Sequence, residues 1–145
     1  MTADEATLVA AWRYDGDWSV YNLDSAGSLL DDSPCYHAVL ADDRLVGFCC
    51  TGIAARVPGI ADEPGILDVG MGMDPALVGQ GHGTAFGAAV PRYLTAHQPN
   101  QMMRVVIQGW NARSLQFAYR LGFSEIGELI VRQSGQRVTY RVLTK

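Results

Sequence analysis

The sequence predicts one α/β or α+β domain built around a mixed sheet. The chain has 145 residues, 48% of them hydrophobic, and short β-rich runs alternate with helical segments. A chain of this length can bury one core and is too short for two ordinary domains. We therefore expect residues 1–145 to form a single domain, without repeats or linkers.

Each element follows from the spacing of its apolar residues. Helices place apolar side chains three or four positions apart, and strands are short runs of β-branched and apolar residues. Pro91 lies inside the helical pattern of residues 83–97 and should kink it. Asn111 and Gly122 can cap the last helix. In chain order we expect helix 4–14, a loop or short helix 15–22, a hairpin of strands 36–40 and 45–53 joined by turn 41–44, strand 66–73, helix 83–97, strand 102–108, helix 112–121, and a hairpin of strands 128–132 and 137–143.

Charge and hydropathy argue against several classes of partner. Eleven Lys and Arg against fifteen Asp and Glu give a net charge of -4, without the basic excess of nucleic-acid binders. No apolar run approaches the roughly 20 residues of a membrane helix, and the first residues lack a signal-peptide pattern. We expect a cytoplasmic protein with no nucleic-acid or membrane partner, and a homodimer remains open.

The cysteines and histidines do not indicate a metal site. Cys35, Cys49 and Cys50 lie in apolar, strand-like runs and are typical of buried reduced thiols. The three histidines are scattered, and no C-x-x-C pair occurs. We expect no metal.

A glycine-rich segment predicts an anion site between strand 66–73 and helix 83–97. Glycines let a backbone approach a ligand closely, and the free N–H groups of a first helical turn bind phosphate. The segment lacks the Gly-Lys-Ser/Thr of a Walker A loop, and it lacks the third small residue, at Thr84, and the later acidic partner of a dinucleotide fingerprint. For the glycines alone, a flexible strand-to-helix turn is the alternative. The residues are Gly79, Gln80, Gly81, His82, Gly83 and Thr84.

A second pattern begins at Asn111 and ends with Leu121, Gly122 and Phe123, at the next helix along the chain. With the glycine segment and the Asp74-Pro75 step before it, this pattern resembles the GNAT superfamily of acetyl-CoA-dependent N-acetyltransferases. The resemblance covers almost the whole chain and is strongest over residues 67–123. It implies a mixed, mostly antiparallel, twisted sheet of six or seven strands flanked by about four helices, with acetyl-CoA as co-substrate.

The resemblance also implies a coenzyme site. The backbone of Met71, Gly72 and Met73 would pair with the pantetheine arm, and Asn111 would contact the same arm. The amides of residues 79–84 would hold the pyrophosphate, although Val78 replaces the Gln or Arg usual at the head of this motif. A backbone N–H of Met71 or Met73 would polarise the thioester carbonyl.

Proton transfer needs a general base and a general acid. Asp68 is a possible general base, because its apolar neighbours would raise its pKa. The alternative is that Asp68 faces away from the cleft and bonds to backbone. The position where many family members have a tyrosine acid is Ala118, and Tyr119, one residue later, should face elsewhere on the helix.

The acceptor side is expected on the first helix and the loop that follows it. Rings and acids close in sequence favour a compact cation, so we predict a small primary amine, attacking acetyl-CoA directly in a ternary complex. Core packing of Trp12 and Tyr21 is the alternative for those rings. Other functions left open are a non-catalytic acyl-CoA binder, a peptide N-terminal acetyltransferase and, more weakly, a nucleotide-phosphate binder. The acceptor-side residues are Trp12, Tyr14, Trp18 and Tyr21, with Asp15 and Asp17.

Overall fold

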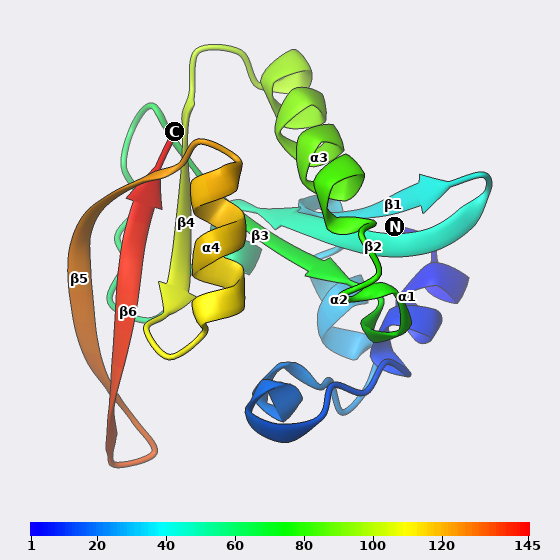
Figure 1. The fold of residues 1–145 in the computed structure, drawn as a ribbon, viewed down its shortest axis with the longest axis horizontal. Coiled ribbons are helices and arrows are strands. Elements are labelled where there is room, and N and C mark those ends of the chain that lie inside the picture. The colour runs from blue at the N-terminus through cyan, green and yellow to red at the C-terminus, as the bar shows by residue number, and fades with distance from the viewer.

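Six strands form one sheet in the order β1-β2-β3-β4-β6-β5 (Figure 1). The computed structural model describes residues 1–145, except the side chain of Ser33. The β3–β4 pair is parallel and the other four pairs are antiparallel, which confirms the predicted mostly antiparallel sheet. The strands are β1 (Tyr36–Ala41), β2 (Arg44–Thr51), β3 (Ile66–Met73), β4 (Met102–Gln108), β5 (Ser124–Gln133) and β6 (Gln136–Thr144). The α-helices are α1 (Ala3–Ala10), α2 (Gly27–Asp31), α3 (Gly83–His97) and α4 (Ala112–Arg120).

The middle of the chain follows the sequence prediction closely. The observed bounds of β3, α3 and β4 are the predicted ones, and Asn111 caps α4 by accepting a hydrogen bond from the N–H of Ser114. Pro91 lies inside α3 and is buried. A Cβ atom at Gly87 would lie 2.4 Å from Cζ of Phe117, so this glycine lets α3 and α4 approach each other closely.

The two ends of the chain differ from the prediction. Helix α1 ends at Ala10 instead of Tyr14, because Arg13 folds back and donates to the carbonyl oxygens of Ala10 and Trp12. The five-residue helix α2 was not expected, since a segment of one turn has no helical periodicity to detect. Strands β5 and β6 extend beyond the predicted segments because exposed polar residues continue their ladder at both ends.

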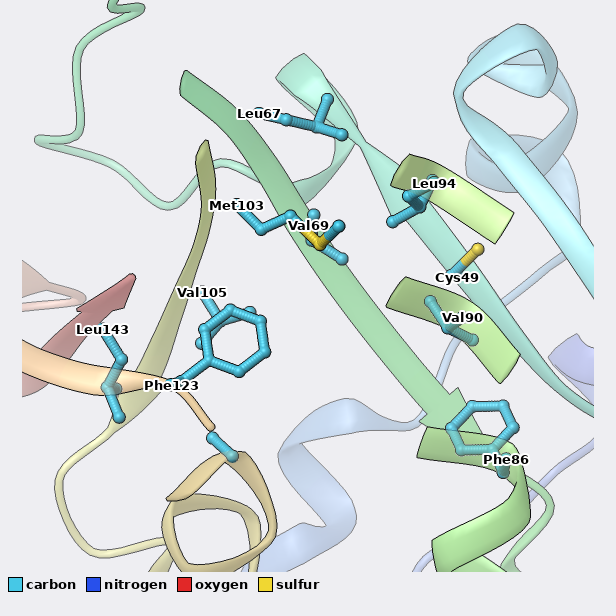
Figure 2. Close-up of a cluster of buried hydrophobic side chains, with 11 residues drawn as sticks. Cys49, Leu67, Val69, Phe86, Val90, Leu94, Met103, Val105, Phe123 and Leu143 are labelled. Carbon is cyan, nitrogen blue, oxygen red and sulfur yellow. The ribbon is translucent and has the colours of Figure 1, made fainter. Parts of the chain in front are cut away.

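Two apolar clusters cover opposite faces of the sheet. The larger one lies between the sheet and helices α3 and α4, and it contains Leu67, Val69, Val90 and Leu143 (Figure 2). The smaller one packs α1 and α2 against the other face of β1 and β2. Among the described residues, no helix combines the length and the apolar character that crossing a bilayer requires.

The cysteines are free thiols in two different environments. Cys49 and Cys50 are buried, and burial raises the pKa of Cys49 to about 11 and that of Cys50 to about 12. Cys35 is only half-buried, so the expectation of a buried thiol is wrong at that position.

Candidate functional site

Strands β3 and β4 pair only at their beginnings. Their parallel ladder joins residues 66–68 of β3 to residues 102–104 of β4, which we call the closed end. Beyond it, residues 69–73 and 105–108 diverge, and we call this part the open end (Figure 1). The backbone edges at the open end are not paired with each other, so they are the place where a ligand can bond to both strands.

The β3 edge at the open end is set by the alternation of hydrogen bonds with β2. The N–H of Asp74 donates to the carbonyl of Val46 at 3.0 Å, and antiparallel bonding repeats at every second residue. Gly72 therefore bonds toward β2, whereas the backbone N–H groups of Met71 and Met73 point toward β4. This orientation is the one required of the predicted oxyanion donors.

The glycine loop, residues 79–84, connects β3 to α3. Gly79 and Gly81 have φ of 80° and 87°, a conformation that favours glycine. The first helical hydrogen bond of this end runs from the N–H of Phe86 to the carbonyl of His82 at 3.2 Å, so the N–H groups of residues 83–85 precede the helical ladder. Most of the loop is exposed. It can therefore present several N–H groups to an anion.

Asp68 lies at the closed end and is 2% exposed. Its Oδ1 accepts from Nε of Arg104 at 2.7 Å, and its Oδ2 accepts from Nε of Arg56 at 2.8 Å. Burial raises the pKa of Asp68, but the two arginines outweigh it and hold this pKa below its usual value. The expected rise in pKa is wrong, because the neighbours in sequence are apolar but the neighbours in space are cations. Asp68 is an ion-pair partner and is unsuited to act as a base.

The face of the sheet on which Asp68 lies agrees with the alternative that this side chain points away from the cleft. Leu67 and Val69 belong to the core cluster under α3 and α4, and successive side chains of a strand point to opposite faces. Asp68 thus faces away from these helices, with two arginines as its partners instead of the expected backbone groups.

An aromatic loop, residues 14–22, crosses the open end. Asn22 closes its base: the N–H of Tyr14 donates to Oδ1 of Asn22 at 2.7 Å, and Nδ2 of Asn22 donates to the carbonyl of Tyr14 at 3.2 Å. The short helix η1 (Gly16–Tyr21) lies between these two residues, and none of its residues is buried. Hydrogen bonds and contacts of its aromatic rings therefore hold this loop in place.

The aromatic loop is bonded to strand β3 and to Asn111, the residue between β4 and α4. On the β3 side, the hydroxyl of Tyr14 donates to the carbonyl of Met73 at 2.7 Å. On the β4 side, Nε1 of Trp18 donates to Oδ1 of Asn111, and Nδ2 of Asn111 donates to the hydroxyl of Tyr21, each at 3.2 Å. Burial and the nearby charge of Asp74 raise the pKa of Tyr14 to about 12, so Tyr14 keeps its proton as a donor.

The side chain of Asn111 is bonded within the chain. Its side chain is 2% exposed and makes three bonds within the chain: to the N–H of Ser114, to Trp18 and to Tyr21. Its amide is thus directed at the start of α4 and at the aromatic loop. The contact with a coenzyme arm that the resemblance implies stays a prediction.

The predicted acceptor residues divide between the core and the open end. Trp12 stacks on Phe48, with ring centroids 6.2 Å apart, and it packs against the smaller core cluster. This packing favours the alternative of core packing for Trp12. Tyr14, Trp18 and Tyr21 do lie together, in the aromatic loop.

The sequence analysis missed Trp110, which lies in the turn directly after β4. Its ring lies 5.8 Å from that of Trp18 and 6.3 Å from that of Tyr21, between centroids, and it is 41% exposed. The guanidinium of Arg113 lies 4.2 Å from the centre of the Trp18 ring. A tryptophan at the carboxyl end of a central strand was the signal available in the sequence. The hollow beside this cluster is lined by Gly16, Asp17, Ser19, Val20 and Trp110.

Tyr119 lies outside this region, as expected from its offset on α4. It is exposed, and its hydroxyl donates to Glu125 at 2.7 Å. This hydrogen bond is the main reason that the pKa of Tyr119 is raised. Ala118, the neighbouring residue at the usual acid position, is buried in the larger core cluster.

Comparisons with known proteins identify the fold. No protein-family model and no curated protein sequence match the chain. The solved structure of a GNAT-family acetyltransferase from Bacillus anthracis is similar, with a TM-score of 0.77 and 12% identity, over 100% of this chain and 90% of that one. A GNAT phosphinothricin acetyltransferase from Sinorhizobium meliloti, solved in complex with AcCoA, has a TM-score of 0.70 and 16% identity, over 100% and 84%.

A third similar structure has a different kind of substrate in its name. The ribosomal-protein-alanine N-acetyltransferase from Brucella melitensis has a TM-score of 0.70 and 15% identity, over 100% of this chain and 96% of that one. Identities at this level carry information about the fold alone. Together with the parting of β3 from β4, the glycine loop and the order of the strands, they show that this chain has the GNAT fold.

Proposed function

We propose that the chain is an acetyl-CoA-dependent N-acetyltransferase. One observation carries the proposal. The backbone N–H groups of Met71 and Met73 point toward β4 at the open end, and β3 leads from there to the glycine loop at the start of α3. A long thioester ligand fits this arrangement, with its carbonyl at the N–H groups of β3 and its pyrophosphate at those of the glycine loop. The similar structure that holds AcCoA supports this reading.

The chemistry needs few side chains. Acetyl-CoA supplies an activated acyl group: the amine nitrogen bonds to the thioester carbon, the C–S bond breaks, the thiolate leaves and the amine gives up a proton. The backbone N–H of Met71 or Met73 stabilises the carbonyl oxygen as it gains charge. Holding both substrates at the open end supplies much of the remaining rate. Because Asp68 is paired with two arginines, we assign the amine proton to solvent.

For the acceptor we propose a small primary amine that is cationic or aromatic. The rings of Trp18, Tyr21 and Trp110 lie together, and the exposed carboxylate of Asp17 lines the hollow beside them. Peptide N-termini are the competing acceptors, as the similarity to a ribosomal-protein-alanine N-acetyltransferase suggests.

The acceptor class is tested by kcat/KM for polyamines, aromatic amines, aminoglycosides and short peptides at low and high salt. Asp17→Asn and added salt should each lower kcat/KM for the best small cation. A wide margin in favour of peptides would refute the small-amine proposal.

A non-catalytic acyl-CoA binder is the second candidate. Two observations favour it: Asp68 is neutralised by arginines, and Tyr119 is bonded to Glu125 away from the open end. This function requires tight coenzyme binding without transfer to any amine or peptide.

Calorimetry with acetyl-CoA tests the binding step. Gly81→Val should weaken the affinity more than tenfold, because valine is strained at a φ of 87° and disturbs the loop amides. Gly135→Val is the matched control, since Gly135 also has positive φ and open space but lies in the β5–β6 turn. Equal affinities of the two variants, or no binding by the wild type, would refute the coenzyme site. Thiol release that depends on an acceptor then separates an enzyme from a binder.

A further inference from the structure

We infer that Asn111 is a positioning residue of the acceptor site, acting through the aromatic loop. The inference rests on the proposed function, because it assigns one residue to one of the two substrates. It depends on three structural steps: what Asn111 touches, how else the aromatic loop is held, and where the coenzyme donors lie.

The first step is the bonding of the buried amide. Oδ1 of Asn111 accepts two N–H donors, from Ser114 at 3.1 Å and from Trp18 at 3.2 Å, and Nδ2 donates to Tyr21 at 3.2 Å. The side chain thus caps α4 with one bond and holds two rings of the aromatic loop with the other two. The donors and acceptors match in one orientation of the amide, which fixes the loop against the end of β4.

The second step is that few other contacts hold the helical part of this loop, namely those of Trp110 with the rings of Trp18 and Tyr21 and of Arg113 with Trp18. No residue of η1 is buried, and Asp15, which precedes it, makes no capping bond with its side chain. Asn22 closes the base of the loop and Tyr14 ties that base to β3. Trp18 and Tyr21, at the other end, have Asn111 as their hydrogen-bond partner in the described structure. Their rings form one side of the aromatic cluster with Trp110.

The third step is the place of the coenzyme donors. The proposed donors are backbone groups of β3 and of the glycine loop before α3, whereas Asn111 directs its amide toward residues 18 and 21. Loss of the Asn111 amide should therefore displace the rings of Trp18 and Tyr21 beside the acceptor and leave acetyl-CoA binding unchanged.

Asn111→Ser separates these roles. Serine is a good N-cap and preserves the start of α4, but its hydroxyl is too short to bond both rings. Because two hydrogen bonds to the aromatic loop are lost, the KM of the best amine should rise about tenfold. The dissociation constant of acetyl-CoA, measured by calorimetry, should change less than about twofold.

Trp18→Phe is the matched partner variant, since it keeps a ring and removes the donor to Asn111. If both residues act through one bond, the double variant should raise the amine KM little more than the larger single effect. Hydrogen exchange of residues 16–21 supplies a readout without substrate: exchange should accelerate in Asn111→Ser and stay unchanged in Tyr119→Phe.

The outcomes distinguish failure of the role of Asn111 from failure of the proposed function. A larger effect of Asn111→Ser on acetyl-CoA affinity than on the amine KM would make Asn111 a coenzyme residue and overturn the inference. Unchanged amine KM or unchanged exchange of residues 16–21 would also overturn it. Absence of acetyl-CoA binding by the wild type would instead overturn the proposed function, and with it the assignment to an acceptor.

Discussion

The two ends of the β3–β4 pair are held by different forces. At the closed end, Asp68 and Arg104 are 2% and 4% exposed, and full charges bind the strands to each other and to the preceding loop. At the open end, Tyr14 and Asn111 connect the strands through the aromatic loop by neutral hydrogen bonds. Loss of one partner of a buried ion pair strongly destabilises a protein, whereas a neutral hydrogen bond contributes about 1 kcal/mol to the free energy of unfolding. The closed end is thus suited to hold β3 and β4 together where they begin to diverge. The open end is suited to adjust around a ligand.

The closed end also orders the segment before β3. Arg104 donates to the carboxylate of Glu63 and, at 2.7 Å, to the carbonyl of Ala61. Arg56 donates to Asp62 at 2.9 Å and to Asp68 at 2.8 Å. Charges from three parts of the chain therefore meet where β3 and β4 part, and no described buried side-chain polar atom is left without a partner.

The largest effect is expected from breaking the closed end. Asp68→Ala leaves Arg104 buried without its main partner and should lower the free energy of unfolding by about 3–5 kcal/mol. The control is Glu128→Ala, which breaks an exposed pair with Arg141 and should cost about 1 kcal/mol or less. Urea denaturation measures both, and similar losses in the two variants would contradict the contrast between buried and exposed pairs.

A second effect concerns acid stability. The pKa of Asp68 is lowered in the folded state, so its contribution is present above the unfolded pKa, about 3.9, and is lost as pH falls through the folded pKa. The unfolding free energy of the wild type should therefore fall more steeply below about pH 4 than that of Asp68→Asn. Denaturation curves from pH 6 to pH 2 test this, and parallel pH profiles of the two proteins would show that Asp68 is not the coupled group.

A smaller effect is expected at the open end. Tyr14→Phe removes the hydrogen bond to the carbonyl of Met73 and should lower the unfolding free energy by about 1 kcal/mol. Tyr93→Phe is a suitable control, because the Tyr93 hydroxyl has no hydrogen-bond partner among the described residues and the ring is 41% exposed. A loss for Tyr14→Phe as large as that for Asp68→Ala would remove the contrast between the two ends.

The smallest effect is expected for Tyr119→Phe. The hydroxyl is exposed and bonded to Glu125, so kcat with the best acceptor should change less than about twofold. Steady-state kinetics with saturating acetyl-CoA checks this. A general acid contributes on the order of a hundredfold or more, and a loss of that size would show that Tyr119 reaches the reacting groups.

The sequence by itself determined the elements whose pattern is local. The apolar residues of 66–73, 83–97 and 102–108 predict these elements to the residue, because short β-branched and apolar runs favour strands and apolar residues three or four positions apart favour a helix. The positive φ of Gly79 and Gly81 and the cap at Asn111 are also local, since glycine freedom and capping depend on residues at most a few positions apart.

Only the tertiary structure decided which side chains share a site. The partners of Asp68 and Asn111 lie far along the chain: Arg104 is 36 residues from Asp68, and Trp18 is 93 residues from Asn111. The pKa of Asp68 depends on those partners, so its apolar sequence neighbours predicted the wrong direction. The packing of Trp12 against Phe48 and of Trp110 beside Trp18 was not predicted for the same reason, because each is a contact between distant segments that no local period records.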